Sequence, residues 1–187
     1  VEQTAELGAT RQCQVLLVTS VTAGEGKSTV ASNLALSLAK KHRAVMLIDA
    51  DLRNPTQIRI LGRKAMGKQG LEHLLQEESL DEYRVMEAAA YDEATNLVTI
   101  ISEEPCRNAG KLLSSQIGRL MSVLRKTMDY IIVDSPPVGM FADGDVLADV
   151  ADGVLLVVRQ DVVSACDIND AADAISQGRA AFLGCVL

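Results

Sequence analysis

The feature that most constrains the fold is the stretch SVTAGEGKST, residues 20–29, which separates two apolar segments with different periods. The preceding run, QVLLVTS, has the length and β-branched content of a buried strand. After the stretch, Val30, Leu34 and Leu38 recur every four residues, as they would on one face of a helix. A phosphate-binding loop requires this order of strand, glycine-rich turn and helix. The segment therefore predicts a nucleotide site in an α/β fold.

The glycine-rich turn has the residues that phosphate binding needs. Gly24 and Gly26 allow a tight turn, so that successive backbone N–H groups can point at one anion. Lys27 would reach the β- and γ-phosphates, and Ser28 would offer its hydroxyl to Mg²⁺. Val21 replaces the first glycine of the usual G-x-x-x-x-G-K-[ST] pattern, and a turn with an incidental lysine is the alternative. We expect the nucleotide to contact Thr22, Ala23, Gly24, Glu25, Gly26, Lys27, Ser28 and Thr29.

Further apolar runs predict the rest of the sheet. Strand-like runs lie at 44–49, 96–101, 130–134, 153–159 and 181–187. Helical patterns separate them, most clearly over 108–126 and around Leu71 to Leu75, whereas the polar region 52–95 predicts loops and short surface helices. Such alternation predicts a three-layer α/β sandwich, with a mostly parallel sheet and helices on both faces. We expect one domain over 1–187, trimmed at both ends, because the chain lacks a first methionine and stops within an apolar run.

Acidic residues follow two of the predicted strands. Asp49 and Asp51 come at the end of the run 44–49, where they share one side of an extended chain. Ligands of α/β sheets bind at the carboxyl ends of strands, and paired carboxylates suit a hard cation and a general base. A solvated acidic loop is the alternative. Asp134 ends the run YIIVD, as in a Walker B strand, and would hold Mg²⁺.

Two later acidic residues carry a different expectation. Asp143 and Asp145 precede the predicted helix near Val146, and we expect them only to cap that helix. Pro136 and Pro137 follow Asp134 closely, so the strand should run out into a loop.

Composition excludes some classes of protein. The net charge is −7, which argues against a nucleic-acid partner, because such proteins need a basic face. The four cysteines are widely spaced and match neither a zinc site nor a dithiol motif. No apolar run reaches the length of a membrane span, and no signal peptide is present.

The motifs together resemble a known family. VTSVTAGEGKST, LIDADLRNP, IIVDSPPV and ADGVLLVVR are similar to segments of the bacterial tyrosine kinases of capsule and exopolysaccharide export. These are P-loop proteins related to partitioning and division-site ATPases. The resemblance implies that ATP and ADP bind with Mg²⁺, that Lys27 is catalytic together with Asp49 and Asp51, and that Ser28, Asp49 and Asp134 hold the metal.

The resemblance also implies partners. Family members phosphorylate tyrosines on a neighbouring subunit and need a membrane-spanning co-polymerase or activator, so it implies a homo-oligomer in the cytoplasm at the inner face of the membrane. The tyrosine-rich tail of the family is absent, and its ring-contact helix is not recognisable within residues 1–12.

Two other functions stay open. Partitioning ATPases usually carry a lysine where this chain has Thr22, which favours the kinase. A nucleotide-binding scaffold of an export complex would not need Asp49, Asp51 and Asp134 together.

Overall fold

The computed structural model describes residues 12–187, and the position expected for the ring-contact helix lies almost wholly outside them. A seven-stranded sheet runs through the centre in the order β3-β4-β2-β5-β1-β6-β7. All neighbouring strands pair in parallel except β3 and β4. The strands are β1 (Gln14–Ser20), β2 (Val45–Asp49), β3 (Ala90–Asp92), β4 (Leu97–Ile100), β5 (Tyr130–Asp134), β6 (Gly153–Val157) and β7 (Ala181–Val186).

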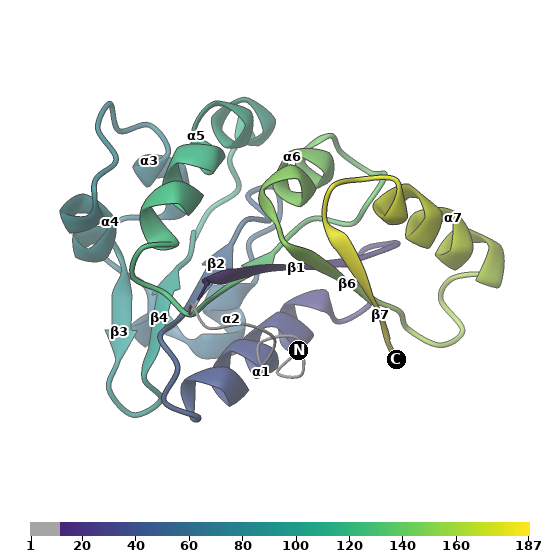
Figure 1. The fold of residues 1–187 in the computed structure, drawn as a ribbon, viewed down its shortest axis with the longest axis horizontal. Helices are drawn as coiled ribbons and strands as arrows, with labels where there is room; N and C mark the ends of the chain where they lie inside the picture. Colours follow the sequence, from purple (N-terminus) through teal and green to yellow (C-terminus); the bar gives the residue numbers. More distant parts are fainter. Residues whose placement is uncertain (1–11) are drawn as a thin grey trace.

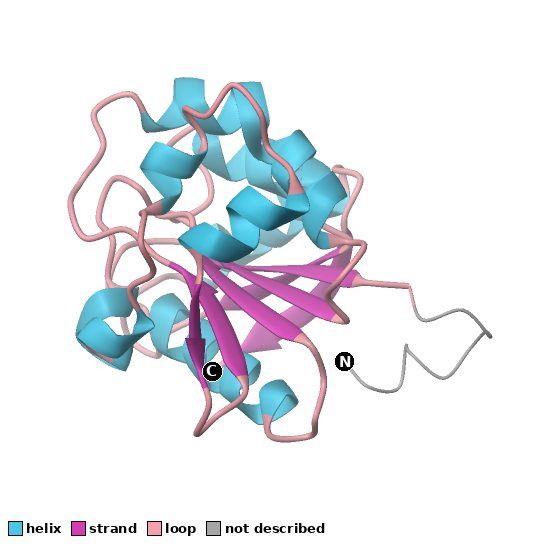
Figure 2. Ribbon diagram, turned by 90° about the vertical axis from the view of Figure 1, so that its left-hand side faces the viewer, coloured by secondary structure: helices cyan, strands magenta, loops and turns pink. Residues whose placement is uncertain are grey.

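Helices cover both faces of this sheet, as Figures 1 and 2 show. The helices are α1 (Lys27–Ala39), α2 (Gln57–Leu61), the 3-10 helix η2 (Arg63–Ala65), α3 (Leu71–Leu74), α4 (Glu82–Ala88), α5 (Ala109–Leu124), α6 (Asp143–Val150) and α7 (Ala165–Ser176). In Figure 1, α1 and α2 lie below the sheet, and α3 to α7 lie above it. The expected three-layer sandwich is confirmed.

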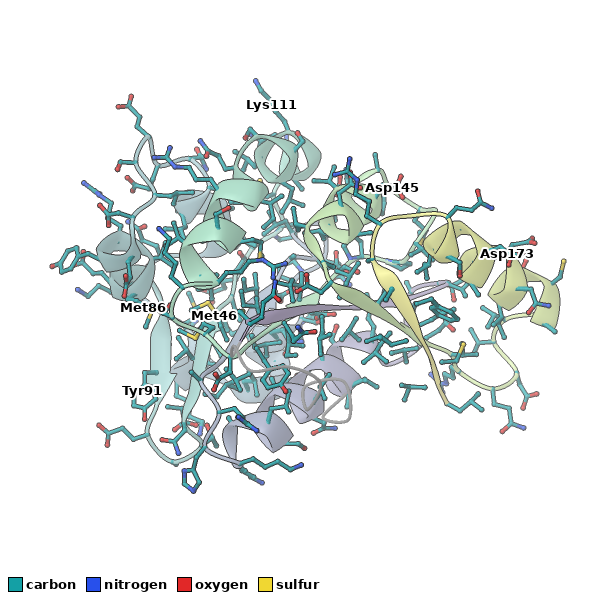
Figure 3. All side chains as sticks on the ribbon, viewed as in Figure 1. Met46, Met86, Tyr91, Lys111, Asp145 and Asp173 are labelled. Atoms are coloured by element: carbon teal, nitrogen blue, oxygen red, sulfur yellow. The ribbon has the colours of Figure 1, made fainter. Side chains whose placement is uncertain are left out.

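Two apolar cores hold the layers together. The smaller core packs α1, through Ala31, Ala35 and Leu38, against one face of the central strands. The larger core packs α3 to α7 against the other face. Strands buried on both faces need continuous apolar runs, which is why their positions could be predicted from sequence. In Figure 3, Met46 of β2 lies in the interior, whereas Lys111, Asp145 and Asp173 point away from the molecule.

The parallel arrangement positions the site. β5 lies between β1 and β2 and pairs with both, and its Asp134 is in register with Asp49 of β2 and with Val18 of β1. The loops that follow these strands therefore lie side by side at the carboxyl ends of the strands. Among residues 12–187, no helix has both the length and the apolar character that crossing a membrane requires.

Candidate active site

The loop after β1 has the backbone geometry of an anion site. Gly24 and Gly26 have φ angles of 85° and 95°, in the left-handed region that favours glycine. Nothing lies within 4 Å of a Cβ built on either glycine. Glycine is therefore needed at both positions for its backbone conformation, since a side chain there would meet no neighbouring atoms. α1 begins at Lys27 without a side-chain cap or an acidic residue in its first turn. Its first N–H groups and the positive end of its dipole are thus available to an anion.

Val21 is compatible with this loop. The three non-glycine residues with positive φ in the described chain are His42, Asn96 and Asp161, so the loop needs no glycine at position 21. The Val21 side chain is partly buried and packs against the larger core.

The side chain of Glu25 turns back into the loop. Its Oε1 accepts hydrogen bonds from the backbone N–H and the hydroxyl of Thr22, and its Oε2 accepts the Arg159 N–H at 3.2 Å. The Arg159 guanidinium also donates to the Gly24 carbonyl at 3.4 Å. Glu25 is buried and spans the loop, so its structural role is to hold the turn in shape. Ala23, Gly24, Gly26 and Thr29 are exposed.

Lys27 joins the three predicted motifs. Its ammonium lies 2.8 Å from Asp51 Oδ2 and 3.7 Å from Asp134 Oδ1, and it donates to Ser28 Oγ at 3.4 Å. Burial lowers the pKa of Lys27, but the carboxylates of Asp134 and Asp51 outweigh it and leave that pKa above its usual value. Lys27 is therefore a permanent buried cation facing the acidic strand ends.

Asp49 and Asp134 are fully buried side by side at the ends of β2 and β5. Asp49 Oδ2 accepts the backbone N–H groups of Thr56 at 3.0 Å and Gln57 at 2.9 Å. Burial raises the pKa of Asp49 to about 8, and the charge of Asp134 adds to the shift. Burial also raises the pKa of Asp134, although Lys27 acts against it.

Gln57, at the start of α2, connects the motifs, and sequence reasoning missed it. Its amide nitrogen donates to Asp134 Oδ2 at 2.8 Å and to the Ser28 carbonyl at 3.0 Å. Its amide oxygen accepts the Ser32 hydroxyl at 2.6 Å. The preceding Thr56 donates to Ser28 Oγ at 2.8 Å. The one available signal was the position of Gln57 in the loop directly after LIDADLRNP.

The expectation that Asp143 and Asp145 cap a helix is wrong. α6 begins at Asp143 itself, and Ala142 holds the cap position without a side-chain hydrogen bond. Asp143 is buried and its Oδ2 pairs with Arg53 Nε at 2.7 Å, while Asp145 is exposed. This ion pair and the burial of Asp143 explain why the carboxylate turns away from the helix end.

A pocket of about 520 Å³ lies over the loop after β1. The phosphate loop forms one part of its lining, and the loops after β2 and β5 form the rest. Asp51 lines this pocket, but Asp49 and Asp134 lie behind it at the strand ends. The lining residues are Ala23, Gly24, Gly26, Lys27, Ser28, Thr29, Asp51, Arg53, Asn54, Thr56, Ile60, Pro136, Pro137, Met140 and Phe141.

The residues present fit a magnesium nucleotide. Within the described part of the chain, Oδ1 of Asp49 and Oδ1 of Asp134 are buried without a hydrogen-bond partner. Such orphaned oxygens are costly unless another group satisfies them. No group of three His, Cys, Asp or Glu residues among residues 12–187 could by itself hold a metal. The two buried carboxylates beside the phosphate loop would suit Mg²⁺, which usually takes one or two carboxylates together with phosphate oxygens and water.

Comparison with known proteins identifies the family. Residues 11–187 match the ParA family model, described as an NUBPL iron-transfer P-loop NTPase. The tyrosine-protein kinase CpsD of Streptococcus agalactiae serotype III is 30% identical over 179 residues, which are 95% of this chain and 75% of CpsD. The tyrosine-protein kinase YwqD of Bacillus subtilis is 33% identical over 178 residues, 95% of this chain and 73% of YwqD. The chain belongs to the bacterial tyrosine kinases.

Solved structures agree with this bacterial tyrosine kinase assignment. The kinase domain of VpsO is 29% identical, with a TM-score of 0.82 over 94% of this chain and 84% of that domain. The division-site protein MinD of Pyrococcus horikoshii, solved with Mg-ADP, has a TM-score of 0.78 over 94% of this chain and 70% of MinD. Its identity of 19% establishes a shared fold alone. The pocket lies over the glycine-rich loop, the part of the fold that P-loop proteins use to bind phosphates.

Proposed function

We propose that the chain is an ATP-dependent protein-tyrosine kinase that acts in the assembly of capsular or extracellular polysaccharide. Membership of the bacterial tyrosine kinase family supports the reaction, and the names of CpsD, YwqD and the VpsO kinase domain agree with it. The observation that carries the proposal is the position of Lys27, which faces Asp51 and Asp134 at the floor of the site.

The chain would bind the nucleotide through its loop. The backbone N–H groups of residues 22–29 would hold the phosphates, and Lys27 would stabilise the negative charge that develops on the γ-phosphoryl group. Ser28, Asp49 and Asp134 would hold Mg²⁺, and the buried Oδ1 atoms of Asp49 and Asp134, which lack hydrogen-bond partners, support this part of the proposal. When bound, Mg²⁺ would supply further neutralisation of the phosphate charge.

Asp51 is placed better than Asp49 to take the proton of the attacking tyrosine. Asp51 lines the pocket, whereas Asp49 is fully buried and already accepts two backbone N–H groups. In the reaction, a bond would form between the tyrosine oxygen and the γ-phosphorus as the bond to ADP breaks. The tyrosine proton would pass to Asp51 Oδ2. Without nucleotide, the Lys27 ammonium donates to this oxygen at 2.8 Å. With nucleotide bound, the ammonium would contact the phosphates instead and leave Asp51 Oδ2 able to accept the proton.

The partners remain part of the proposal. By analogy with the family, we propose a homo-oligomer that works with a membrane-spanning co-polymerase or activator on the cytoplasmic side of the membrane, with tyrosines of a neighbouring copy as acceptors.

Incubation of the chain with ATP and Mg²⁺ tests the proposal. We expect phosphotyrosine on a tyrosine-containing acceptor, and its loss in Lys27→Met, because this variant lacks the cation that faces the phosphates. ATP hydrolysis that DNA stimulates, without any phosphotyrosine, would support a partitioning-type ATPase instead. The similarity to MinD shows a shared fold and does not by itself support that alternative function.

A further inference from the structure

Exposed apolar side chains form part of the lining of the nucleotide pocket, called its apolar wall here. Ile60, Met140 and Phe141 are 42%, 52% and 37% exposed, and all three line the pocket. Pro136 and Pro137 extend the same wall. Phosphate groups and Mg²⁺ need polar ligands and gain nothing from such a surface. The wall therefore serves a ligand with an apolar part.

The strand order shows which end of the nucleotide lies near this wall. Ile60 follows β2 and Met140 and Phe141 follow β5, on the side of β1 to which the Lys27 ammonium points. Because Lys27 reaches the β- and γ-phosphates, the γ-phosphoryl end lies on that side. Arg159, which follows β6 on the other side of β1, contacts the loop at Gly24. With the γ-phosphoryl end near the wall, the nucleoside would extend toward β6 and β7, away from the wall.

Phe141 is held in a defined position. The Arg53 guanidinium lies 4.1 Å from the centroid of the Phe141 ring, and the same group pairs with the buried Asp143. Gly110, in the first turn of α5, packs closely against this pair, since a Cβ there would lie 2.6 Å from Asp143 Oδ1. One face of the ring is thus occupied, and the exposed part of the side chain is available to a ligand.

We propose that Ile60, Met140 and Phe141 form the subsite that receives the aromatic ring of the acceptor tyrosine. This inference rests on the proposed kinase function and goes beyond it by naming the residues that recognise the acceptor. Asp51 and Lys27 line the same pocket, so a ring on this wall shares one cavity with the γ-phosphoryl group. Arg53 and Asp143 are positioning residues, because they act through Phe141.

Acceptor kinetics test the subsite. The probe is a copolymer of glutamate and tyrosine, phosphorylated with saturating ATP and Mg²⁺, and the variants are Phe141→Ala and Met140→Ala. An aromatic contact contributes about 1 kcal/mol, so we expect Phe141→Ala to raise KM for the copolymer about fivefold to tenfold. We expect a smaller rise in Met140→Ala and little change in kcat. Phe141→Tyr, which keeps the ring, should restore the low KM.

Two controls accompany these variants. The first is Met86→Ala, which removes a methionine that is 39% exposed on α4, outside the pocket (Figure 3). This variant should keep the wild-type KM for the copolymer. The Kd for Mg-ADP, measured by calorimetry, should stay within about twofold in Phe141→Ala, because the wall contacts the acceptor and not the nucleoside.

The possible failures can be told apart. A wild-type chain that phosphorylates the copolymer, with unchanged KM in both Phe141→Ala and Met140→Ala, overturns the subsite and leaves the kinase function intact. An equal rise in KM and in the Kd for Mg-ADP assigns the wall to the nucleoside and also overturns the subsite. If circular dichroism shows that Phe141→Ala does not fold, the KM of Met140→Ala for the copolymer is the deciding measurement: a raised KM supports the subsite and an unchanged KM overturns it. A wild-type chain that makes no phosphotyrosine even together with its co-polymerase or activator overturns the function and the subsite together.

Discussion

At the scale of single residues, Gln57 has no exposed surface, and its side chain hydrogen-bonds Ser28, Ser32 and Asp134. Those partners come from the phosphate-loop helix and from the end of β5, so one amide fixes their spacing. Lys27 could be predicted from the sequence, because the ten residues 20–29 contain the whole glycine-lysine-serine pattern that identifies it. Gln57 was not found, because its role depends on contact with Asp134, 77 residues away. For the same reason the pairing of Arg53 with Asp143 was not foreseen.

Removal of this amide should destabilise the protein. Gln57→Leu leaves Asp134 Oδ2 buried without its amide donor, whereas the Ser32 hydroxyl keeps the Ser28 carbonyl as acceptor, and we expect a loss of about 2–3 kcal/mol in the free energy of unfolding. Urea unfolding measures it. Gln76→Leu is the matched control, since Gln76 is exposed and bonds one carbonyl of its own segment, and it should cost less than about 0.5 kcal/mol. Equal costs in the two variants would contradict the role given to Gln57.

The buried carboxyl groups predict a pH dependence of stability. Burial raises the pKa of Asp49 to about 8, compared with about 3.9 in an unfolded chain, and raises that of Asp134 as well. Between these values the folded state binds more protons than the unfolded state. The contribution of these groups to stability is therefore complete at low pH and is lost as the pH rises toward 8.

The urea midpoint of the nucleotide-free protein should accordingly be lower at pH 8 than at pH 6. Asp49→Asn, which cannot ionise, should show a smaller decrease, and Asp173→Asn on the exposed face of α7 should behave as the wild type. An undiminished decrease in Asp49→Asn would show that Asp49 does not cause it.

At the scale of elements, the strands that are buried on both faces and the edge strand β7 were predictable, whereas the other edge strand, β3, was not. The runs at 14–20 and 130–134 became β1 and β5 with the expected bounds, because continuous apolar sequence is needed where helices cover both faces. The three-residue β3 was missed, since it is an edge strand with an exposed Tyr91 and no apolar pattern. The polar region 52–95 holds short helices, as predicted, but their bounds depend on packing against the larger core.

Arg125 follows α5 and joins three elements near the amino ends of the strands, whereas the site lies at their carboxyl ends. Its guanidinium binds both oxygens of Asp152 at 2.8 and 2.9 Å and donates to the carbonyls of Cys13 and Val150. Asp152 Oδ2 also accepts the Val15 N–H at 2.7 Å. The ends of α5 and α6 and the start of β1 are thus tied together.

We expect Arg125→Met to lower the free energy of unfolding by about 1–2 kcal/mol, because it removes the bidentate partner of Asp152 and the donor to two carbonyls. Arg63→Met removes a single ion pair with Glu103 at a side chain that is 82% exposed, and should cost less than about 0.5 kcal/mol. Thermal or urea unfolding of the two variants gives the comparison. A smaller cost for Arg125→Met than for Arg63→Met would refute the bridging role.

At the scale of the whole molecule, the fold brings residues 27, 51 and 134 together because β1, β5 and β2 are adjacent parallel strands. The sequence alone could predict this convergence, because parallel strands with helical crossovers end at one edge. It could not predict that Asp51 would line the pocket while Asp49 lies behind it, since the pattern indicated that the two share one side of an extended chain, whereas β2 ends at Asp49. On this difference the proposed function assigns phosphoryl transfer to Asp51 and support of the site to Asp49.

The most direct test of the account compares phosphotransfer with nucleotide binding in Asp51→Asn. Single-turnover phosphorylation of the tyrosine copolymer should fall by about 10²-fold or more, because the group that takes the proton is lost. The Kd for Mg-ADP should change by only a few-fold, because the loop and Lys27 remain. Phosphorylation at the wild-type rate, or a loss of binding as large as the loss of transfer, would contradict the assignment of Asp51 and with it the central account of the site.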